Sequence, residues 1–265
     1  MSAPALVLVA HGTRSARGVG MIADLAAAVT RELGAVTPAP ISELVVSREV
    51  RIPKASDELR SSGLHTPLVR TAFVDVLGPS PSEVLRDLGS VPAVVVPAFL
   101  ASGYHVYQDV PREVAESEHP SVAVTPALGP DPALARIMRL RLREAGWRPG
   151  DAVVFAAAGS SDARARHDVR RAARMLGDHL RTPVPVAYIA TGTPRVPEVV
   201  AALRESGARR VFIASYLLAH GLFHQRLHEA GADGVAAPLG VHPAAVHLLL
   251  DRYTTAARTL TPAAA

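Results

Sequence analysis

Two histidines in this chain follow apolar stretches of strand length. The first, His11, ends the run at 6–10 and precedes Gly12, where the chain turns into a helical pattern. The second, His105, follows a similar apolar run at 94–101. Buried parallel strands present ligand-binding groups at their carboxyl ends, so we expect both imidazoles at one edge of a sheet. Imidazoles in that position suit metal binding or proton transfer near neutral pH.

A carboxylate follows a third apolar run. Asp75 lies at the end of residues 69–76, so its strand would deliver it to the same edge as the two histidines. Two imidazoles and one carboxylate suit a divalent ion such as Fe²⁺, Co²⁺ or Ni²⁺, with coordination positions left open. Asp109 lies four residues after His105, one helical turn away, and we expect it to orient that imidazole from behind. The predicted metal ligands are therefore His11, Asp75 and His105.

The elements that must position these residues alternate between apolar strands and helical patterns. The strands are expected at 4–10, 69–76, 92–98, 121–126, 151–157, 184–190, 210–216 and 234–237. The helices are expected at 18–33, 80–88, 107–116, 132–145, 163–180, 195–206, 222–230 and 243–258. This alternation is typical of βαβ units around parallel sheets.

The second half of the chain repeats the first. The matching segments, in the same order, are 12–17 with 159–164, 72–79 with 187–194, 99–103 with 217–221, and 128–132 with 239–243. We therefore predict an α/β protein of two similar doubly wound parallel-sheet domains with a cleft between them, at 1–147 and 148–265. The first domain has an insertion at about 35–68, which is either a lid over the site or a disordered excursion.

The repeat separates residues that shape the backbone from residues that could do chemistry. Glycines and prolines of the turns recur in both halves, whereas His11, Asp75 and His105 correspond to Ala158, Ala190 and Phe223. Loss of all three polar groups together indicates one site, carried by the first domain only.

Composition narrows the class of protein. Of 265 residues, 49% are hydrophobic, enough for one large domain or two medium domains with real cores, but no apolar run is long enough to span a membrane. Cysteine is absent, so a metal must be held by nitrogen and oxygen ligands, and we expect a cytoplasmic protein. The net charge is +4, and all 28 basic residues except Lys54 are arginines. The excess of arginine reflects either an acidic ligand or coding bias. Runs of basic residues with interleaved aromatic residues, which are typical of nucleic-acid binding, are absent from the sequence.

The stretches at 10–14, 73–83 and above all 97–111 resemble the sirohydrochlorin chelatases, which are class II tetrapyrrole chelatases of the cobalt- and ferrochelatase type. The most specific element is Gly-x-His-x-x-x-Asp-x-Pro, which runs from Gly103 to Pro111. The resemblance implies metal insertion into sirohydrochlorin between two lobes, with His11 and His105 handling the metal and the pyrrole protons. Asp75 matches a carboxylate that is usually glutamate, and its side chain is one methylene shorter.

The resemblance also implies the ligands. Fe²⁺ or Co²⁺, with Ni²⁺ possible, would be the substrate metal for sirohaem or cobalamin synthesis, and no tightly bound cofactor is expected. Sirohydrochlorin carries eight carboxylates, so we expect Arg14 and Arg17 to bind it, with Gly103 and Tyr104 also contacting it. The partners are then the acidic tetrapyrrole and the metal, without nucleic acid or membrane, in a monomer or homodimer.

Other interpretations remain open. A carrier that binds metal or tetrapyrrole without turnover, or a degenerate regulatory relative, would have much the same sequence. A histidine-phosphatase-like enzyme also opens with a strand ending in His-Gly, but there an arginine precedes the histidine, where this chain has Ala10. The histidines at 220, 224 and 228 form either a second metal-binding stripe, interrupted by Gly221, or an exposed helix face.

Overall fold

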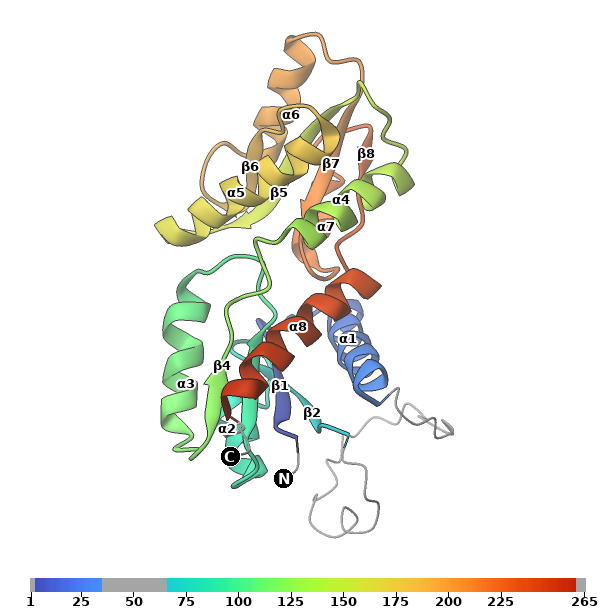
Figure 1. Ribbon diagram of the computed structural model, residues 1–265. Helices are drawn as coiled ribbons and strands as arrows, with labels where there is room; N and C mark the ends of the chain where they lie inside the picture. Colours follow the sequence, from blue (N-terminus) through green and yellow to red (C-terminus); the bar gives the residue numbers. More distant parts are fainter. Residues whose placement is uncertain (1–2, 35–65, 261–265) are drawn as a thin grey trace.

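The computed structural model describes residues 3–34 and 66–260. Most of the predicted insertion at 35–68 lies outside these residues. The chain forms two lobes, each built on a four-stranded parallel sheet (Figure 1). None of the helices among the described residues is long and apolar enough to cross a membrane.

The first sheet has the order β2-β1-β3-β4, with all neighbours parallel. Its strands are β1 (Ala5–Ala10), β2 (Val69–Phe73), β3 (Ala93–Pro97) and β4 (Val122–Val124). The associated helices are α1 (Ala16–Gly34), α2 (Pro81–Leu88), the π-helix η1 (His105–Asp109) and α3 (Val110–Glu116). Every residue of the central strands β1 and β3 is buried, as their unbroken apolar sequences predict.

The second sheet repeats this order as β6-β5-β7-β8. Its strands are β5 (Ala152–Gly159), β6 (Val186–Thr191), β7 (Val211–Tyr216) and β8 (Gly234–Val235). Helices α5 (Ala163–Leu180), α6 (Val196–Glu205) and α7 (Leu222–Leu227) belong to this lobe. The predicted α/β class with two similar parallel sheets is therefore confirmed.

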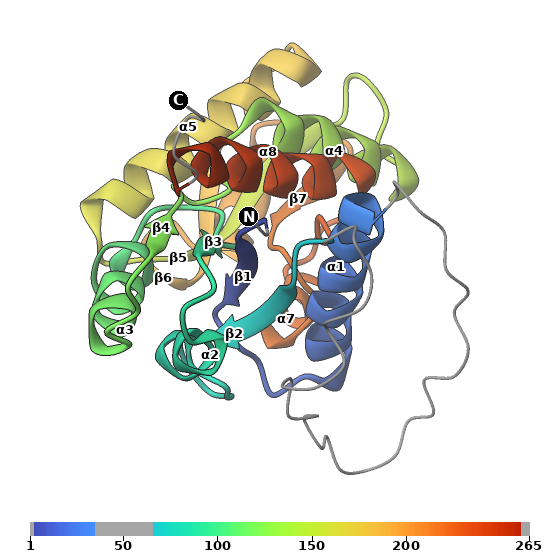
Figure 2. The same ribbon diagram turned by 60° about the horizontal axis from the view of Figure 1, so that its bottom comes forward.

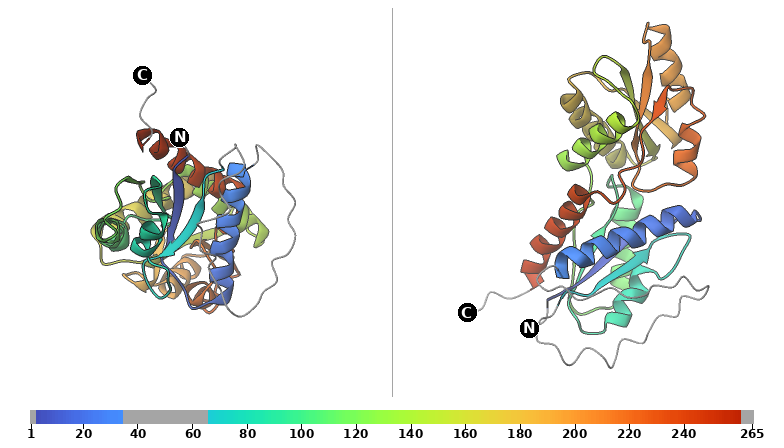
Figure 3. Two further views of the ribbon diagram at one scale, coloured as in Figure 1. Left: turned by 90° about the horizontal axis from the view of Figure 1, so that it is seen from below. Right: turned by 90° about the vertical axis from the view of Figure 1, so that its right-hand side faces the viewer.

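The last helix of each half crosses to the other lobe. Helix α4 (Pro132–Glu144) packs against β7 and α5 of the second lobe, and α8 (Pro243–Leu260) packs against β3 and β4 of the first. Figure 2 shows these two helices side by side, and Figure 3 shows α8 next to α1. The Tyr253 hydroxyl of α8 donates to the Pro4 carbonyl at 2.6 Å. The division into domains at 1–147 and 148–265 remains a prediction. In the structure each half of the chain contributes its last helix to the other lobe.

One hydrophobic cluster therefore runs through both lobes. It joins Leu8 and Leu25 of the first lobe to Phe155 and Phe212 of the second, through α4 and α8. Separating the lobes would expose part of this apolar surface to water, which costs about 25 cal/mol per Å². The cluster therefore stabilises the contact between the lobes.

The segments that follow the strands in one lobe pack against those that follow the strands in the other. Tyr216, at the end of β7, donates to the Leu100 carbonyl at 2.7 Å. Burial, with Asp168 and Asp131 nearby, raises the pKa of the Tyr216 hydroxyl, which keeps its proton for this bond. The carboxyl ends of both sheets are thus held facing each other.

Candidate functional site

His11 is placed by the end of strand β1 and the turn at Gly12. Gly12 has a φ of +95°, and a Cβ atom there would overlap the Asp75 carbonyl oxygen. Only glycine fits a backbone that is both left-handed and this close to its neighbour. Asp75 N–H in turn donates to the His11 carbonyl at 3.1 Å, which extends the pairing of β1 with β2.

His105 is placed by the π-helix η1. The Val110 N–H donates to the His105 carbonyl, five residues back, and α3 begins at Val110. Pro111 lacks an amide hydrogen, and in an α-helix its ring would clash with the Tyr107 carbonyl, so the wider turn relieves this conflict. A helix was predicted from residue 107, and the π-helix therefore begins two residues earlier than expected.

The two imidazoles lie together. Their ring centroids are 4.5 Å apart with planes tilted by 45°, although the residues are separated by 94 positions in the sequence. Phe99 stacks on the His105 ring at 5.8 Å and 23°, and Tyr104 approaches it edge-on at 6.2 Å. The His105 side chain is 33% exposed and His11 is exposed, so a ligand can reach both rings.

Asp109 forms a hydrogen bond with the His105 ring and orients it, as the four-residue spacing predicts. Its Oδ2 is 2.6 Å from His105 Nδ1, and its Oδ1 is 3.0 Å from Arg112 Nη2. A carboxylate can only accept, so Nδ1 carries the hydrogen, and in the neutral ring the Nε2 lone pair is then available for a metal or a proton. Asp109 is 7% exposed, and its side chain therefore has little room to turn away.

Asp75 lies near His11 through the backbone, but its side chain is turned to its own loop. Its Oδ1 accepts from the Val76 N–H at 2.7 Å, and the residue is exposed. Among the described residues, no three His, Asp or Glu side chains converge as a metal-binding group. The set of His11, Asp75 and His105 as metal ligands therefore remains a prediction.

The other predicted contact residues differ in their surroundings. Arg14 and Arg17 are exposed on the loop and helix after His11, and neither forms an ion pair with another described residue. Tyr104 is 58% exposed. Gly103 instead packs on the second lobe, where a Cβ atom would lie 3.3 Å from Ala165 Cβ.

The histidine stripe of the second lobe is not an exposed helix face. His224 is buried with Nε2 3.1 Å from the Ala236 carbonyl, whereas His228 is exposed. His220 and His224 have ring centroids 4.8 Å apart, and His224 and His228 5.0 Å, both edge-to-face. The pairs do not aim three nitrogens at one point, in line with the absence of a metal-binding group among the described residues.

Three residues that support the site are not among the predicted site residues. Phe99, Arg112 and Tyr216 contact His105, Asp109 and Leu100 respectively. Arg112 follows Asp109 by three residues, a helical spacing that does signal the ion pair. Phe99 and Tyr216 act through tertiary contacts that no local pattern signals.

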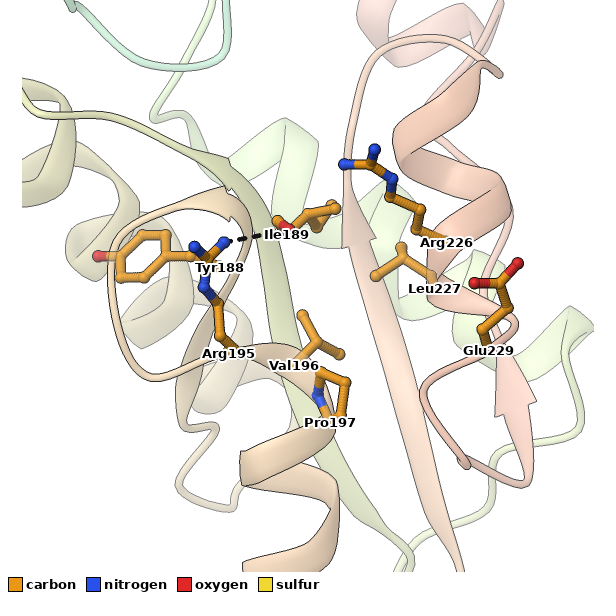
Figure 4. A pocket seen from close by; sticks show the side chains of 8 residues that line it. All are labelled: Tyr188, Ile189, Arg195, Val196, Pro197, Arg226, Leu227 and Glu229. Carbon is orange, nitrogen blue, oxygen red and sulfur yellow. Dashed lines mark hydrogen bonds between the residues drawn. The ribbon is translucent and has the colours of Figure 1, made fainter.

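A cavity of about 410 Å³ lies in the second lobe between β6, the start of α6 and α7. Arg195 and Arg226 lie on opposite sides of this cavity (Figure 4), and Leu227 of α7 is part of its lining. The Arg195 guanidinium is occupied, because it donates to the Ile189 carbonyl at 3.3 Å and to the Ala190 carbonyl. None of the predicted site residues lines this cavity.

Comparison with known proteins gives consistent matches. The family model described as CbiX matches the chain twice, at residues 50–145 and 152–256. The chain is 24% identical to a sirohydrochlorin ferrochelatase of Priestia megaterium, over 72% of this chain and 79% of that protein. It is 26% identical to a sirohydrochlorin cobaltochelatase of the same organism, over 80% and 78% of the two chains.

Solved structures show the same fold. SirB from Bacillus subtilis with Fe³⁺ superposes with a TM-score of 0.70 at 21% identity, covering 96% of each chain. SirB from Bacillus subtilis subspecies spizizenii in complex with cobalt gives a TM-score of 0.66 at 20% identity, covering 96% of this chain and 95% of that one. The chain therefore belongs to the CbiX family of sirohydrochlorin chelatases, in the two-domain form that carries the family unit twice.

Proposed function

We propose that this protein inserts a divalent metal, Fe²⁺ or Co²⁺, into sirohydrochlorin, with His11 and His105 as the working groups. The observation that carries the proposal is the 4.5 Å approach of the two imidazoles at the carboxyl edge of the first sheet. Both rings are accessible, and Asp109 keeps the Nε2 lone pair of His105 available. The relatives named for ferrochelatase and cobaltochelatase activity support the reaction class.

The reaction requires proton acceptors as well as a metal. Insertion of M²⁺ forms four metal–nitrogen bonds and releases two pyrrole N–H protons, so charge balances as the ion enters. A neutral imidazole accepts a proton near pH 7 and also binds divalent metals of this class. His105 Nε2 and the His11 ring can hold the ion at adjacent positions and then take the protons.

The other predicted site residues would supply charge and contacts next to the two histidines. Asp75, in the loop next to His11, offsets positive charge on the ion when its side chain turns inward. Arg14 and Arg17 would bind carboxylates of the substrate, and Tyr104 would contact its edge. Nitrogen and oxygen ligands accept Fe²⁺, Co²⁺ and Ni²⁺ alike, so the supply of metal in the cytoplasm selects the product.

Anaerobic incubation with sirohydrochlorin and either Fe²⁺ or Co²⁺ tests the proposal. We expect the absorption change of metal insertion to proceed for many turnovers per protein molecule, at a rate well above the reaction without protein. The double variant H11A/H105A, shown folded by circular dichroism, should fall to the background rate. H247A is the matched control, because His247 is exposed on α8 and lies outside the site.

The amount of product also separates the proposal from a carrier. A carrier would stop at one equivalent of bound metal or metallated tetrapyrrole, whereas a chelatase continues. A single stoichiometric burst, or full activity in the double variant, would overturn the assignment.

A further inference from the structure

Helix α5 of the second lobe contacts the segment that leads into His105. The Ser102 N–H donates to Asp168 Oδ2 at 2.9 Å, although 66 residues separate the two in the sequence. The next residue, Gly103, packs on the same helix, with its Cβ position 3.3 Å from Ala165 Cβ. Asp168 is half-buried and forms no ion pair with another described residue. Its charge therefore strengthens a hydrogen bond to the backbone of the other lobe.

The anchored segment begins the turn that carries His105. The Gly103 carbonyl accepts from the amides of Val106 and Tyr107, each at 3.1 Å, and this closes the first turn around the histidine. Ser102 directly precedes Gly103, so a bond that holds the Ser102 amide also restricts the direction in which the turn begins. The position of the His105 ring therefore depends on a contact made by the other lobe.

A second contact from α5 reaches the same turn after His105. The Arg164 guanidinium carbon lies 4.2 Å from the centroid of the Tyr107 ring, which is a cation–π geometry. Asp162, which caps α5, orients this guanidinium, with Arg164 Nε 3.4 Å from its Oδ1. Arg164 is exposed, so we expect its contact to contribute less than the bond to Asp168. Helix α5 thus holds the turn on both sides of the histidine in the sequence.

The reciprocal contact between the lobes lacks these groups. In the repeat, α1 corresponds to α5, and the equivalent segment of the second lobe also packs on α1. Met21 stands where α5 has Asp168, and Gln225 stands where the first lobe has Tyr107. The lobes therefore pack on each other in both directions, but the carboxylate and the aromatic ring occur only where the supported segment carries His105.

We propose that Asp168 is a positioning residue for His105, because it fixes from the second lobe the turn that presents this imidazole to His11. Arg164 supports the same turn through Tyr107. This inference rests on the proposed function and goes beyond it, because it gives a role in the reaction to the lobe that has no counterpart of either histidine. Asp168 does not contact the reacting atoms, and its effect passes through the backbone before His105.

Steady-state kinetics with sirohydrochlorin and Co²⁺ test the role of Asp168. D168A should lower kcat about tenfold, because the imidazole is no longer held in place, while KM for sirohydrochlorin changes by less than about twofold. D168N keeps an oxygen that accepts from the Ser102 amide, so it should retain most of the wild-type kcat. R164A should cause a smaller loss than D168A. D178A is the matched control, because Asp178 is exposed at the other end of α5.

A spectroscopic measurement tests the same role without turnover. ¹H–¹⁵N spectra of the imidazole rings, recorded without metal or substrate, report on His105, whose ring signals are identified by their loss in H105A. We expect these signals to shift or broaden in D168A and to stay as in the wild type in D168N and D178A. Circular dichroism verifies folding, and D168S replaces D168A if the alanine variant is unfolded.

The outcomes separate this inference from the proposed function. Wild-type kcat in D168A, or a loss of kcat with unchanged His105 signals, overturns the positioning role. An equal loss in D168A and D168N also overturns it, because the asparagine keeps the acceptor. If the wild-type protein does not turn over, the chelatase proposal fails, and the His105 signals of the same variants still decide whether Asp168 positions the ring.

Discussion

The two lobes use the same backbone for different purposes. Phe73 N–H donates to the Pro79 carbonyl in the first lobe, and Tyr188 N–H donates to the Pro194 carbonyl in the second, each at 2.9 Å. Glu83 Oε2 accepts from the amide that begins α2, and Glu198 Oε2 does the same for α6. Duplicated sheets therefore kept the turns that the fold requires.

The side chains at the strand ends differ between the lobes. His11 and His105 lie in contact in the first lobe, where the second has Ala158 and Phe223. Asp109, hydrogen-bonded to His105, corresponds to the buried Leu227 next to the cavity. The difference teaches that the fold requires the same turn glycines and helix caps in both lobes, whereas the proposed chemistry requires histidines in only one of them.

The largest expected effect separates the histidines from their counterparts. H11A or H105A should lower kcat/KM by about 10²–10⁴, because each removes a proposed metal ligand and proton acceptor. A158S changes the position equivalent to His11 and should retain wild-type activity. Steady-state insertion assays on folded protein check this pair, and comparable losses in A158S would mean that the second lobe also does chemistry.

The turn glycines should matter equally for folding but not for activity. G12A and G159A each force a Cβ atom into a left-handed backbone (φ +95° and +100°) and onto a neighbouring carbonyl. Each should lower the free energy of unfolding by about 2–4 kcal/mol, as urea denaturation would measure. Only G12A should also reduce kcat in the remaining folded protein, because it displaces His11. Equal loss of kcat in G159A would contradict a site confined to the first lobe.

Substitution of Asp109 should have a smaller and more specific effect on catalysis. D109N should lower kcat/KM by about 10- to 100-fold, because an amide can donate to Nδ1 and shift the hydrogen to Nε2. The pH profile of kcat should move as well, which a purely structural role would not cause. D131N is the control, because Asp131 caps α4 and asparagine caps equally well. An unshifted pH profile in D109N would argue against tautomer control.

The smallest effect concerns the buried histidine of the second lobe. Burial, then His228 and Arg17, lower the pKa of His224 from its usual 6.5, although its bond to Ala236 opposes them. The unfolded chain therefore binds more protons below pH 6.5, and stability falls as the pH drops from about 7 toward 5. Lowered carboxyl pKa values, as at Glu113, act only at lower pH.

Urea midpoints at pH 7.5 and 5.0 measure this loss. H224Q keeps an N–H donor for the Ala236 carbonyl but cannot titrate, so its midpoint should fall less than that of the wild type. Part of the decline should persist, since burial also lowers the pKa of His119 and His242. A decline equal to that of the wild type would exclude His224 as a source.

Much of this architecture follows from local sequence patterns. The apolar runs predicted the strands, and the glycine turns predicted where His11 and His105 leave the sheet. Strand β2 nevertheless ends at Phe73 rather than 76, because Asp75 binds the Val76 N–H and Val76 adopts a φ of +67°. The exchange of α4 and α8 between lobes has no local signal either, because both helices have ordinary amphipathic sequences.

The sequence by itself determined two duplicated parallel sheets and the half in which histidines, His11 and His105, follow the strand ends, because apolar periodicity and turn glycines act over a few residues. Tertiary structure alone decided that the rings of His11 and His105 meet at 4.5 Å, that Phe99 stacks on one of them, and that His224 is buried. These contacts depend on how strands and lobes pack, and packing joins residues whose separation in the chain leaves no pattern to interpret.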